Sequence, residues 1–586
     1  MIYPPKLSTA ERESLGMVFT DDKISNFMVR RSLKLLSDSF ESKNKSIEAA
    51  KILDPCIGGA SFDIAIFQAL EQEYIKNYKL SEFLKTNFIG IDIEASAIEL
   101  AKENLKKAGI SYADNLNLKC KDYLTDFNEQ GFDLIIGNPP YIGEKGNRVV
   151  FSKIRATEFG KKYYEKGMDY FYFFIEKSLE LLNEDGILAM ITPAYWTRAD
   201  SASKLREAIR DRASFVDVVD FGELRAFKDA VGHHSLIFFL QKKKTAKFSY
   251  YLINETKNDL GKILENILYD INMSPEPEIS ISKEKQSDFI KSCVSSEFCM
   301  TYSPYFNFIS KKTQGIFEKI KKHTKSTLGE LAAINQGIVS GADRVTNKNL
   351  SVLKEQIDNE ADMNIKIGDG IFVLNEKEAS EYINVCSCLV SFYKNSDITA
   401  YSIKKPKYFL FYSTNKMSDA DKEKAIRHLS KFEFILNKRR ESMLGKLPYY
   451  HLQWPRRKEI FTGEKIVSPQ RALYPSFAYS NEELYASADV YYITDIKENP
   501  FFILGYLNSS FTDFYLRHVG KKKGKYLELY QRPLSEMPVI DISEDKKLEI
   551  AHRAQKITNS KICNALEINQ LKLEIDNIIW NELYNL

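Results

Sequence analysis

Long apolar runs and paired cysteines are the features that this sequence most plainly lacks. No stretch of about 18 apolar residues occurs in the chain, so the sequence predicts no membrane-spanning helix. The first residues include prolines and acids where a signal peptide needs an apolar core. The seven cysteines are scattered without a CxxC pair, which argues against a disulfide framework or a structural zinc site. These absences favour a protein of a reducing cytoplasm, with no membrane partner and no metal.

Net charge is also small, but it is unevenly distributed. The whole chain of 586 residues carries +3. Residues 401–540 hold 24 Lys and Arg against 15 Asp and Glu, or +9, which leaves −6 for the other residues. A basic region joined to a mildly acidic remainder indicates a polyanionic partner such as nucleic acid. A solvated, lysine-rich surface explains the same count equally well.

Short apolar runs alternate with helical patterns in the first part of the chain. The runs lie at 51–54, 88–92, 117–120, 132–138, 186–192, 215–221 and 234–241. Amphipathic stretches such as 62–76 and 170–182 separate them. This alternation predicts an α/β fold, a Rossmann-like, doubly wound sheet of seven strands with helices on both faces. Ligands of such sheets bind at the carboxyl ends of the strands.

The alternation stops near residue 245, and we expect a domain boundary there. Residues 246–540 contain short β-like segments and many tyrosines, which predicts an irregular α+β domain. Residues 541–586 show apolar positions at helical spacing, so we expect a helical tail that packs on the second domain. At ~100–200 residues per domain, this division fits the length of the chain.

The most specific motif is Asn138-Pro139-Pro140-Tyr141, directly after an apolar run. Two consecutive prolines lack backbone N–H donors and have a fixed φ, so they end the strand in a rigid loop. The Asn138 amide oxygen and the Pro139 carbonyl can then accept both hydrogens of one NH2 group, while the Tyr141 ring stacks on its plane. The motif is suited to orienting a planar exocyclic amine as a nucleophile. The alternative is a strand-ending turn with a core tyrosine.

Residues 132–141 resemble the catalytic motif of S-adenosylmethionine-dependent amino-methyltransferases, especially DNA adenine-N6 methyltransferases. Residues 53–62, 90–93 and 121–123 resemble the cofactor motifs of that family, and 16–22 resembles its N-terminal motif. The resemblance implies S-adenosylmethionine as the cofactor. The implied cofactor-binding residues are Phe19, Thr20, Asp54, Pro55, Gly58, Asp92, Ile93, Asp122, Tyr123 and Asn138.

The match has one departure and one further implied residue. The family often has a second glycine where this chain has Ala60, which costs little only if φ is negative there. In the TaqI-like branch, a phenylalanine at the place of Phe227 packs against the flipped adenine; an ordinary buried phenylalanine is the alternative. The implied catalytic residues are Asn138, Pro139, Pro140, Tyr141 and Phe227.

The order of the motifs resembles the gamma class, in which a target-recognition domain follows the catalytic domain. Residues 328–343 and 520–528 resemble the entry to such a domain and a segment near its end. Two basic clusters in the second half are the candidates for DNA contacts. They comprise Arg456, Arg457, Lys458, Lys521, Lys522, Lys523 and Lys525, of which the lysines with Gly520 and Gly524 are expected to form a flexible loop against phosphates.

The expected function is methyl transfer from S-adenosylmethionine to the N6 amine of a flipped-out adenine in double-stranded DNA, for restriction-modification protection. The resemblance implies a monomer in a prokaryotic-type cytoplasm. A cognate restriction endonuclease that shares the site would act separately, with no stable complex required.

Several alternatives to this function remain open. An RNA base methyltransferase is one alternative. A DNA-specificity protein with an inactive methyltransferase domain is another, although the intact NPPY motif and the acidic positions argue against it. A glutamine-N5 protein methyltransferase also uses NPPY but needs no basic C-terminal domain. Cys56 follows a proline, as does the nucleophile of cytosine-C5 methyltransferases, but it lies in the cofactor loop.

Overall fold

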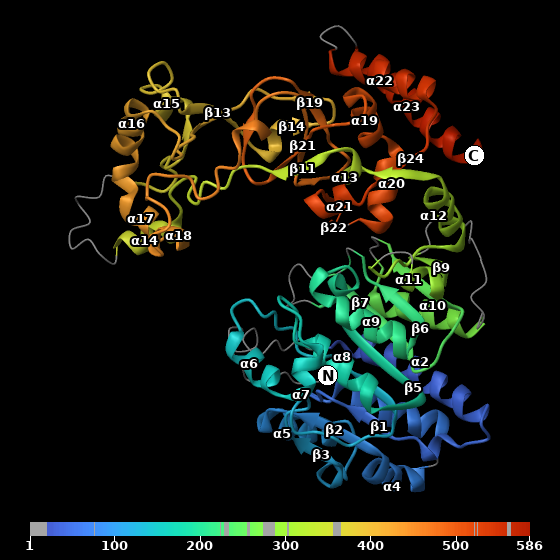
Figure 1. Ribbon diagram of the computed structural model, residues 1–586. Helices are drawn as coiled ribbons and strands as arrows, with labels where there is room; N and C mark the ends of the chain where they lie inside the picture. Colours follow the sequence, from blue (N-terminus) through green and yellow to red (C-terminus); the bar gives the residue numbers. More distant parts are fainter. Residues whose placement is uncertain are drawn as a thin grey trace. The chain divides into compact units, whose positions relative to one another are not determined.

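The computed structural model divides the chain into two compact units, Met1–Gly315 and Ile316–Leu586 (Figure 1). It describes residues 20–75, 77–222, 224, 226–227, 234–254, 258–273, 288–301, 304–354, 365–520, 522–523, 525–559 and 564–585. None of the helices in these ranges combines the length and apolar character of a bilayer span.

A nine-stranded sheet forms the centre of the first unit, in the order β3-β2-β1-β4-β5-β7-β6-β8-β9. Its strands are β1 (Ile52–Asp54), β2 (Phe88–Asp92), β3 (Leu118–Cys120), β4 (Phe132–Gly137), β5 (Leu182–Pro193), β6 (Ser214–Asp220), β7 (Ser235–Gln241), β8 (Lys247–Ile253) and β9 (Phe289–Ser295). Strands β3, β2, β1, β4 and β5 are mutually parallel. All seven predicted strands are present, so the Rossmann-like fold class is confirmed, while β7 runs antiparallel to both its neighbours.

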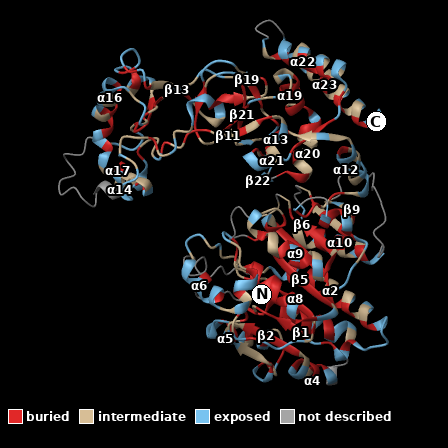
Figure 2. Cartoon of the chain, in the orientation of Figure 1, coloured by how far each residue is buried: buried red, intermediate tan, exposed pale blue. Residues whose placement is uncertain are grey.

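Helices cover both faces of this sheet because its central strands are apolar on both sides. Leu134 and Ile136 of β4 pack into one buried cluster, with α2 (Asp22–Glu41), α3 (Ser61–Ala69) and α10 (Leu260–Met273). Ile135, between them, points to the opposite face and packs with α8 (Phe171–Leu181) and α9 (Ser203–Arg212). Side chains alternate across a strand, so a continuous apolar run is what a doubly covered strand requires. Figure 2 shows the buried core along the sheet.

The first unit extends beyond the predicted boundary at residue 245. β8 pairs in parallel with β6, and β9 closes the edge by pairing antiparallel with β8. Phe306 then packs edge-to-face on Trp196, with ring centroids 5.8 Å apart. The chain segment after 245 therefore completes the nine-stranded sheet before the second unit begins.

The second unit is built from small sheets and helices. One four-stranded sheet has the order β11-β21-β17-β19 and another β12-β16-β13-β20. The strands are β11 (Ala333–Gln336), β21 (Val490–Thr494), β17 (Lys465–Pro469), β19 (Ala478–Ser480), β12 (Val373–Asn375), β16 (Tyr408–Phe411), β13 (Leu389–Tyr393) and β20 (Tyr485–Ala486). This is the irregular α+β arrangement that the sequence predicts for the region.

The chain ends in two helices, α22 (Glu544–Thr558) and α23 (Ala565–Asn585). Ile550 of α22 lies against α19 (Pro500–Leu507), where a side chain added at Gly505 would meet it at 2.7 Å. Trp580 of α23 packs edge-to-face on Phe511 and Phe514 of α20 (Ser510–Val519). The helical tail thus contacts helices of the same unit.

Candidate active site

The candidate site lies at the carboxyl ends of parallel strands in the first unit. Asp54 ends β1 and Asp92 ends β2, Asp122 is the second residue after β3, and Asn138 follows β4 directly. Because these strands are adjacent and parallel, their ends share one edge of the sheet. The sequence motifs, far apart along the chain, are therefore brought to one place, as expected for a doubly wound sheet.

The loop after β1 is held by backbone contacts and contains a left-handed turn. The Ile57 N–H donates to the Ile91 carbonyl at 2.8 Å, which ties the loop to β2. Gly58 has a φ of 49°, which glycine adopts without strain. Pro55, the first residue of the loop, is buried. The small residues allow the backbone of this loop to approach a ligand.

Ala60 also lies in the left-handed region, with a φ of 66° and a ψ of 30° at the N-cap of α3. Alanine replaces the family's glycine at little cost in free energy only where φ is negative. The φ of Ala60 is positive, so this replacement is strained. A left-handed alanine costs ~1–2 kcal/mol. The cofactor loop carries backbone strain that glycine would remove.

We expect Ala60→Gly to stabilise the first unit by about 0.5–1 kcal/mol. The relief of strain is offset in part by the larger conformational entropy of glycine in the unfolded chain. Chemical denaturation followed by circular dichroism measures the change. Ala65→Gly, in the interior of α3, is the control and should destabilise by ~1 kcal/mol or more. Equal destabilisation by the two variants would contradict the argument.

Asp92 is fixed by two backbone N–H groups. Gly58 donates to its Oδ2 and Glu94 to its Oδ1, each at 3.0 Å. Each carboxylate oxygen keeps lone pairs for a further donor. The next side chain, Ile93, is 60% exposed, which is unusual for an isoleucine and leaves an apolar surface beside the carboxylate.

Two predicted cofactor residues beyond β3 differ in their availability. Asp122 is half-buried and accepts a hydrogen bond from the Leu124 N–H at 2.9 Å. Tyr123 is only 3% exposed, packs on Phe174 and shares a hydrogen bond with Ser178 at 3.0 Å. Its ring packs in the core against α8, so little of its surface is available to a ligand, and its packing on the cofactor stays a prediction.

Thr20 lies between the cofactor loop and the NPPY loop, whereas Phe19 falls outside the described residues. The Thr20 carbonyl accepts a hydrogen bond from the Ser61 hydroxyl at 3.3 Å. Its own Oγ1 accepts from the Asn138 Nδ2 at 3.1 Å. This contact orients the Asn138 amide, a role that the sequence did not reveal.

The NPPY loop holds its asparagine oxygen against its own tyrosine. The Tyr141 hydroxyl lies within hydrogen-bonding distance of both the Asn138 Oδ1, at 2.5 Å, and the Ile191 carbonyl, at 3.0 Å. Pro139 is buried and Pro140 half-buried. The Asn138 oxygen has two lone pairs, so it can accept a hydrogen bond from a target amine while the tyrosine hydroxyl still donates to it, and the Ile191 carbonyl is a second acceptor within reach of that hydroxyl.

Phe227 is only 6% exposed and belongs to the hydrophobic core beside α2 and β7. The structure describes it in the position of an ordinary buried phenylalanine, the alternative given above. A contact with a flipped base would require this side chain to become exposed.

Two buried carboxyl groups dominate the electrostatics of the site. Burial raises the pKa of Asp54 to about 7, although its Oδ1 accepts a hydrogen bond from the Cys56 N–H. Burial and the neighbouring Asp54 raise the pKa of Asp63 as well. Oδ2 of Asp54 and both oxygens of Asp63 are buried without a hydrogen-bond partner. Such orphaned acceptors fit a cationic partner, and S-adenosylmethionine carries an ammonium and a sulfonium group.

Asp63 is the residue of this site that the sequence reasoning missed. It lies in the first turn of α3 and is fully buried. A helix-start acid is usually an exposed residue that interacts with the helix dipole, so its presence alone gives no signal. The available clue was its position immediately after the motif 53–62.

The basic residues of the second unit differ in how far their charged groups are already engaged in hydrogen bonds within the protein. Arg456 donates to the Gly337 carbonyl at 3.1 Å and to the Gln336 Oε1 at 2.9 Å, so part of its guanidinium is already engaged. Arg457 and Lys458 are exposed. These two offer charged groups to a polyanion more readily than Arg456 does.

The lysine-rich segment forms a β-hairpin and not a flexible loop. β22 (Lys522–Lys523) pairs antiparallel with β23 (Tyr526–Glu528), which also pairs with β18 (Arg471–Ala472). Lys522 and Lys525 are exposed, whereas Lys521 lies outside the described residues. β23 lies between β22 and β18, so the described part of this segment belongs to a three-stranded sheet.

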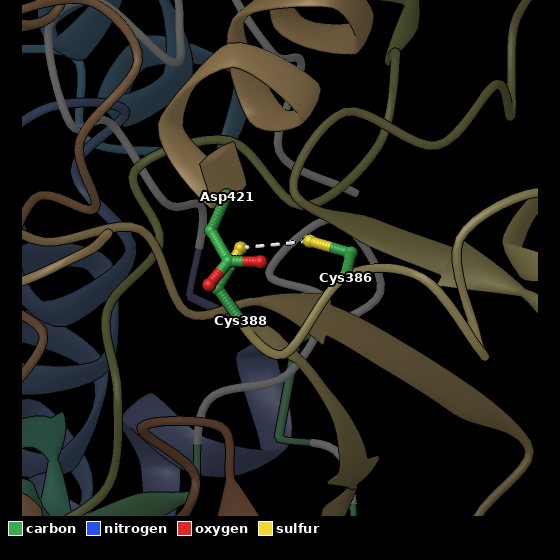
Figure 3. Close-up of side chains that lie close together, drawn as sticks. All are labelled: Cys386, Cys388 and Asp421. Atoms are coloured by element: carbon green, nitrogen blue, oxygen red, sulfur yellow. Dashed lines mark hydrogen bonds between the residues drawn. The ribbon is translucent and has the colours of Figure 1, made fainter. Parts of the chain in front are cut away.

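Cys386, Cys388 and Asp421 form the one group of metal-ligand type found in the described ranges, with their ligand atoms within 4.8 Å of one another (Figure 3). The Asp421 carboxylate already accepts hydrogen bonds from the Ser387 N–H and hydroxyl and from the Ser418 hydroxyl. Burial raises the pKa of the Cys388 thiol, which opposes the thiolate that a metal needs. These contacts give the group a structural use at the start of α16 (Asp419–Leu429).

Comparison with known proteins finds a family model for a segment in each half of the chain. Residues 29–227 match the family model of the Eco57I restriction-modification methylase, and residues 390–539 match that of the TaqI-like C-terminal specificity domain. The resemblance found in the sequence is thus confirmed, with the methylase first and the specificity domain second. The chain is a methyltransferase of the restriction-modification type.

Two relatives extend over nearly the whole chain. The type II methyltransferase M.HindII of Haemophilus influenzae is 24% identical over 97% of this chain and 98% of its own. The type II methyltransferase M.HincII of the same species is also 24% identical, with the same coverage. The solved structure of the type IIL restriction-modification enzyme MmeI with DNA has a TM-score of 0.59 and 13% identity, over 100% of this chain and 76% of that chain. At that identity the likeness shows the fold alone.

Proposed function

We propose that this protein is a site-specific DNA methyltransferase that methylates the exocyclic N6 amine of adenine in double-stranded DNA. The single observation that carries the proposal is the NPPY loop, whose Asn138 follows β4 at the same edge of the sheet at which Asp54 ends β1 and Asp92 ends β2. The TaqI-like specificity domain supports duplex DNA as the substrate over RNA or a protein glutamine. The protein acts as a monomer, apart from any endonuclease that shares its site.

The residues at the strand ends divide the binding of S-adenosylmethionine among them. The Asp92 carboxylate binds the ribose hydroxyls, and the exposed Ile93 packs beside the cofactor base. Asp122 accepts a hydrogen bond from the adenine amine of the cofactor. Asp54 and Asp63 receive the ammonium group, which satisfies their orphaned oxygens. The bound cofactor supplies an electrophilic methyl group on its sulfonium.

Catalysis by the NPPY loop is mainly orientation and charge stabilisation. The target base leaves the duplex, at a cost of a few kcal/mol, and Tyr141 offsets part of it by stacking. Asn138 Oδ1 and the Pro139 carbonyl then accept the two hydrogens of the target amine. This arrangement aims the nitrogen lone pair at the methyl group and stabilises the positive charge that develops on nitrogen. Thr20 holds the Asn138 amide in the required orientation.

The affinity for S-adenosylmethionine should rise with pH up to about 7, because burial holds the pKa of Asp54 at about 7. A cationic ligand binds the ionised carboxylate, so each bound cofactor displaces a proton below that pH. The sign follows from the raised pKa: the folded protein keeps its proton from about pH 4 to 7, and affinity is lost as pH falls. Isothermal titration calorimetry should show up to about a tenfold change per pH unit.

Asp54→Asn is the control for this pH dependence. Its affinity should be weaker at about pH 7.5 and should depend less on pH down to about 5.5, with the remaining dependence due to Asp63, whose pKa burial also raises. A variant that kept the wild-type slope would assign the titration to another group.

The lysine hairpin should contribute phosphate contacts that do not depend on DNA sequence. The double variant Lys522→Ala/Lys525→Ala should weaken binding to all duplexes by similar factors. It should also reduce the slope of log K against log salt by up to ~1.8, at about 0.9 per contact. Fluorescence anisotropy at several salt concentrations measures this slope.

The control removes the same charge from a different surface of the second unit. Lys546→Ala/Lys556→Ala removes two lysines of α22 that pair with Glu549 and Glu567. Its salt slope should stay at the wild-type value. If both double variants gave the wild-type slope, the hairpin would be a solvated surface.

Sequencing of methylated bases in DNA exposed to the protein and cofactor tests the proposed function directly. N6-methyladenine at one recurrent sequence is the expected result, and the same experiment identifies that sequence. Methylation of cytosine, or transfer only to RNA, would overturn the assignment to adenine in DNA.

A further inference from the structure

Tyr195 is a partly exposed aromatic side chain beside the NPPY loop. β4 and β5 are parallel neighbours, with Gly137 paired to Met190, so the segments after them leave the sheet at one edge. Tyr141 follows β4, and Tyr195 lies in η4 (Ala194–Thr197), directly after β5. The two tyrosines therefore come from adjacent strand ends.

One buried carboxylate joins Tyr195 to the NPPY loop. Asp169 is 7% exposed and accepts a hydrogen bond from the Tyr195 hydroxyl at 2.6 Å. Its other oxygen accepts from the N–H of Ile142, the residue after Tyr141, at 3.0 Å. The Ile142 carbonyl in turn accepts from the Tyr170 N–H at 2.9 Å. The position of Tyr195 and that of the loop are thus set by the same group.

The ring of Tyr195 is ordered by packing but not covered. Phe171, which is fully buried, packs edge-to-face on Tyr141 and on Tyr195, with centroid distances of 5.9 Å to each. Tyr195 nevertheless remains 41% exposed, although its hydroxyl is bonded to a buried carboxylate. The exposed part is therefore largely ring surface, held in one orientation. Phe227, the expected partner of Tyr141, is only 6% exposed.

We propose that Tyr195 forms the second aromatic wall of the pocket that receives the extruded adenine, with Asp169 as the residue that positions it. This inference rests on the proposed function and deepens it. A purine needs a flat surface on which to stack outside the duplex, and a fixed tyrosine ring supplies one at small entropic cost. Because Asp169 also holds the backbone after Tyr141, it sets the spacing of the two walls.

The test compares three variants by methyl transfer to a duplex that contains the mapped site. Tyr195→Leu removes the ring, Tyr195→Phe keeps it, and Tyr269→Leu removes a tyrosine that is 66% exposed on α10. We expect Tyr195→Leu to lower kcat/KM for DNA by about 5- to 150-fold, the range for one base–aromatic stack. Tyr195→Phe should keep most of the activity, and Tyr269→Leu all of it. S-adenosylmethionine affinity should stay within a few fold.

A mismatched target adenine separates this role from a purely structural one. A mismatch lowers the cost of extrusion, so it should restore much of the activity that Tyr195→Leu loses. A loss that the mismatch does not reduce, or a Tyr195→Phe variant as poor as Tyr195→Leu, would overturn the role of the ring. If Tyr195→Leu transferred methyl groups as well as the wild type, the role of Tyr195 would be overturned but the proposed function would stand. A wild-type protein that methylates no adenine would overturn the proposed function as well.

Discussion

Asn138→Ala lowers methyl transfer by ~10²–10³ in turnover while leaving S-adenosylmethionine affinity within a few fold. The size follows from the loss of one preorganised acceptor for developing charge, by analogy with oxyanion-hole donors. The Asn138 amide contacts Thr20 and the Tyr141 hydroxyl. Ile191 still accepts from Tyr141 in the variant. Single-turnover transfer and calorimetric cofactor binding measure the two quantities separately.

Asp92→Ala is the matched comparison, since it should weaken cofactor binding first. Its carboxylate binds the Gly58 and Glu94 N–H groups and is proposed to bind the ribose hydroxyls. Turnover at saturating cofactor should fall less than in Asn138→Ala. The assignment of Asn138 to the target amine fails if its alanine variant loses cofactor binding but turns over normally once saturated.

The strands of the candidate site could be predicted from the sequence because they are continuous apolar runs. Runs such as 132–138 and 234–241 correspond to β4 and β7, which are buried on both faces. β9 was missed because it is an edge strand, where only Val294 is fully buried. An edge strand needs no apolar pattern, which explains β9 but not β8, an interior strand that also lies beyond the predicted boundary and is buried at Phe248, Tyr251 and Ile253.

The directions of side chains at the strand ends were less predictable than their positions. Asp92 and Asn138 were located correctly at the sheet edge, but Tyr123 points into the core and Phe227 is covered. A motif fixes the residue types and not the backbone angles that aim them. The left-handed φ of Ala60 is an example, because nothing in the residue's identity indicates it.

Two fragments of the first unit should behave very differently, and the contrast tests the functional division of the chain. The fragment 1–315 should fold and bind S-adenosylmethionine about as tightly as the full chain, because it keeps the whole nine-stranded sheet. It should lose specific DNA binding by ~10³–10⁷, the usual ratio of specific to non-specific affinity. Calorimetry with cofactor and anisotropy with the mapped duplex measure the two affinities.

The shorter fragment 1–245 should aggregate, because it lacks β8 and β9. Without Phe248, Tyr251 and Val294, the apolar faces of the sheet are uncovered. Without β8, β6 becomes an unpaired edge. Unpaired edges of apolar strands are templates for association between chains. Light scattering at equal concentration should distinguish it from 1–315. Specific duplex binding by 1–315 at full-chain affinity would move target recognition into the first unit, and a well-folded 1–245 would show that β8 and β9 are dispensable.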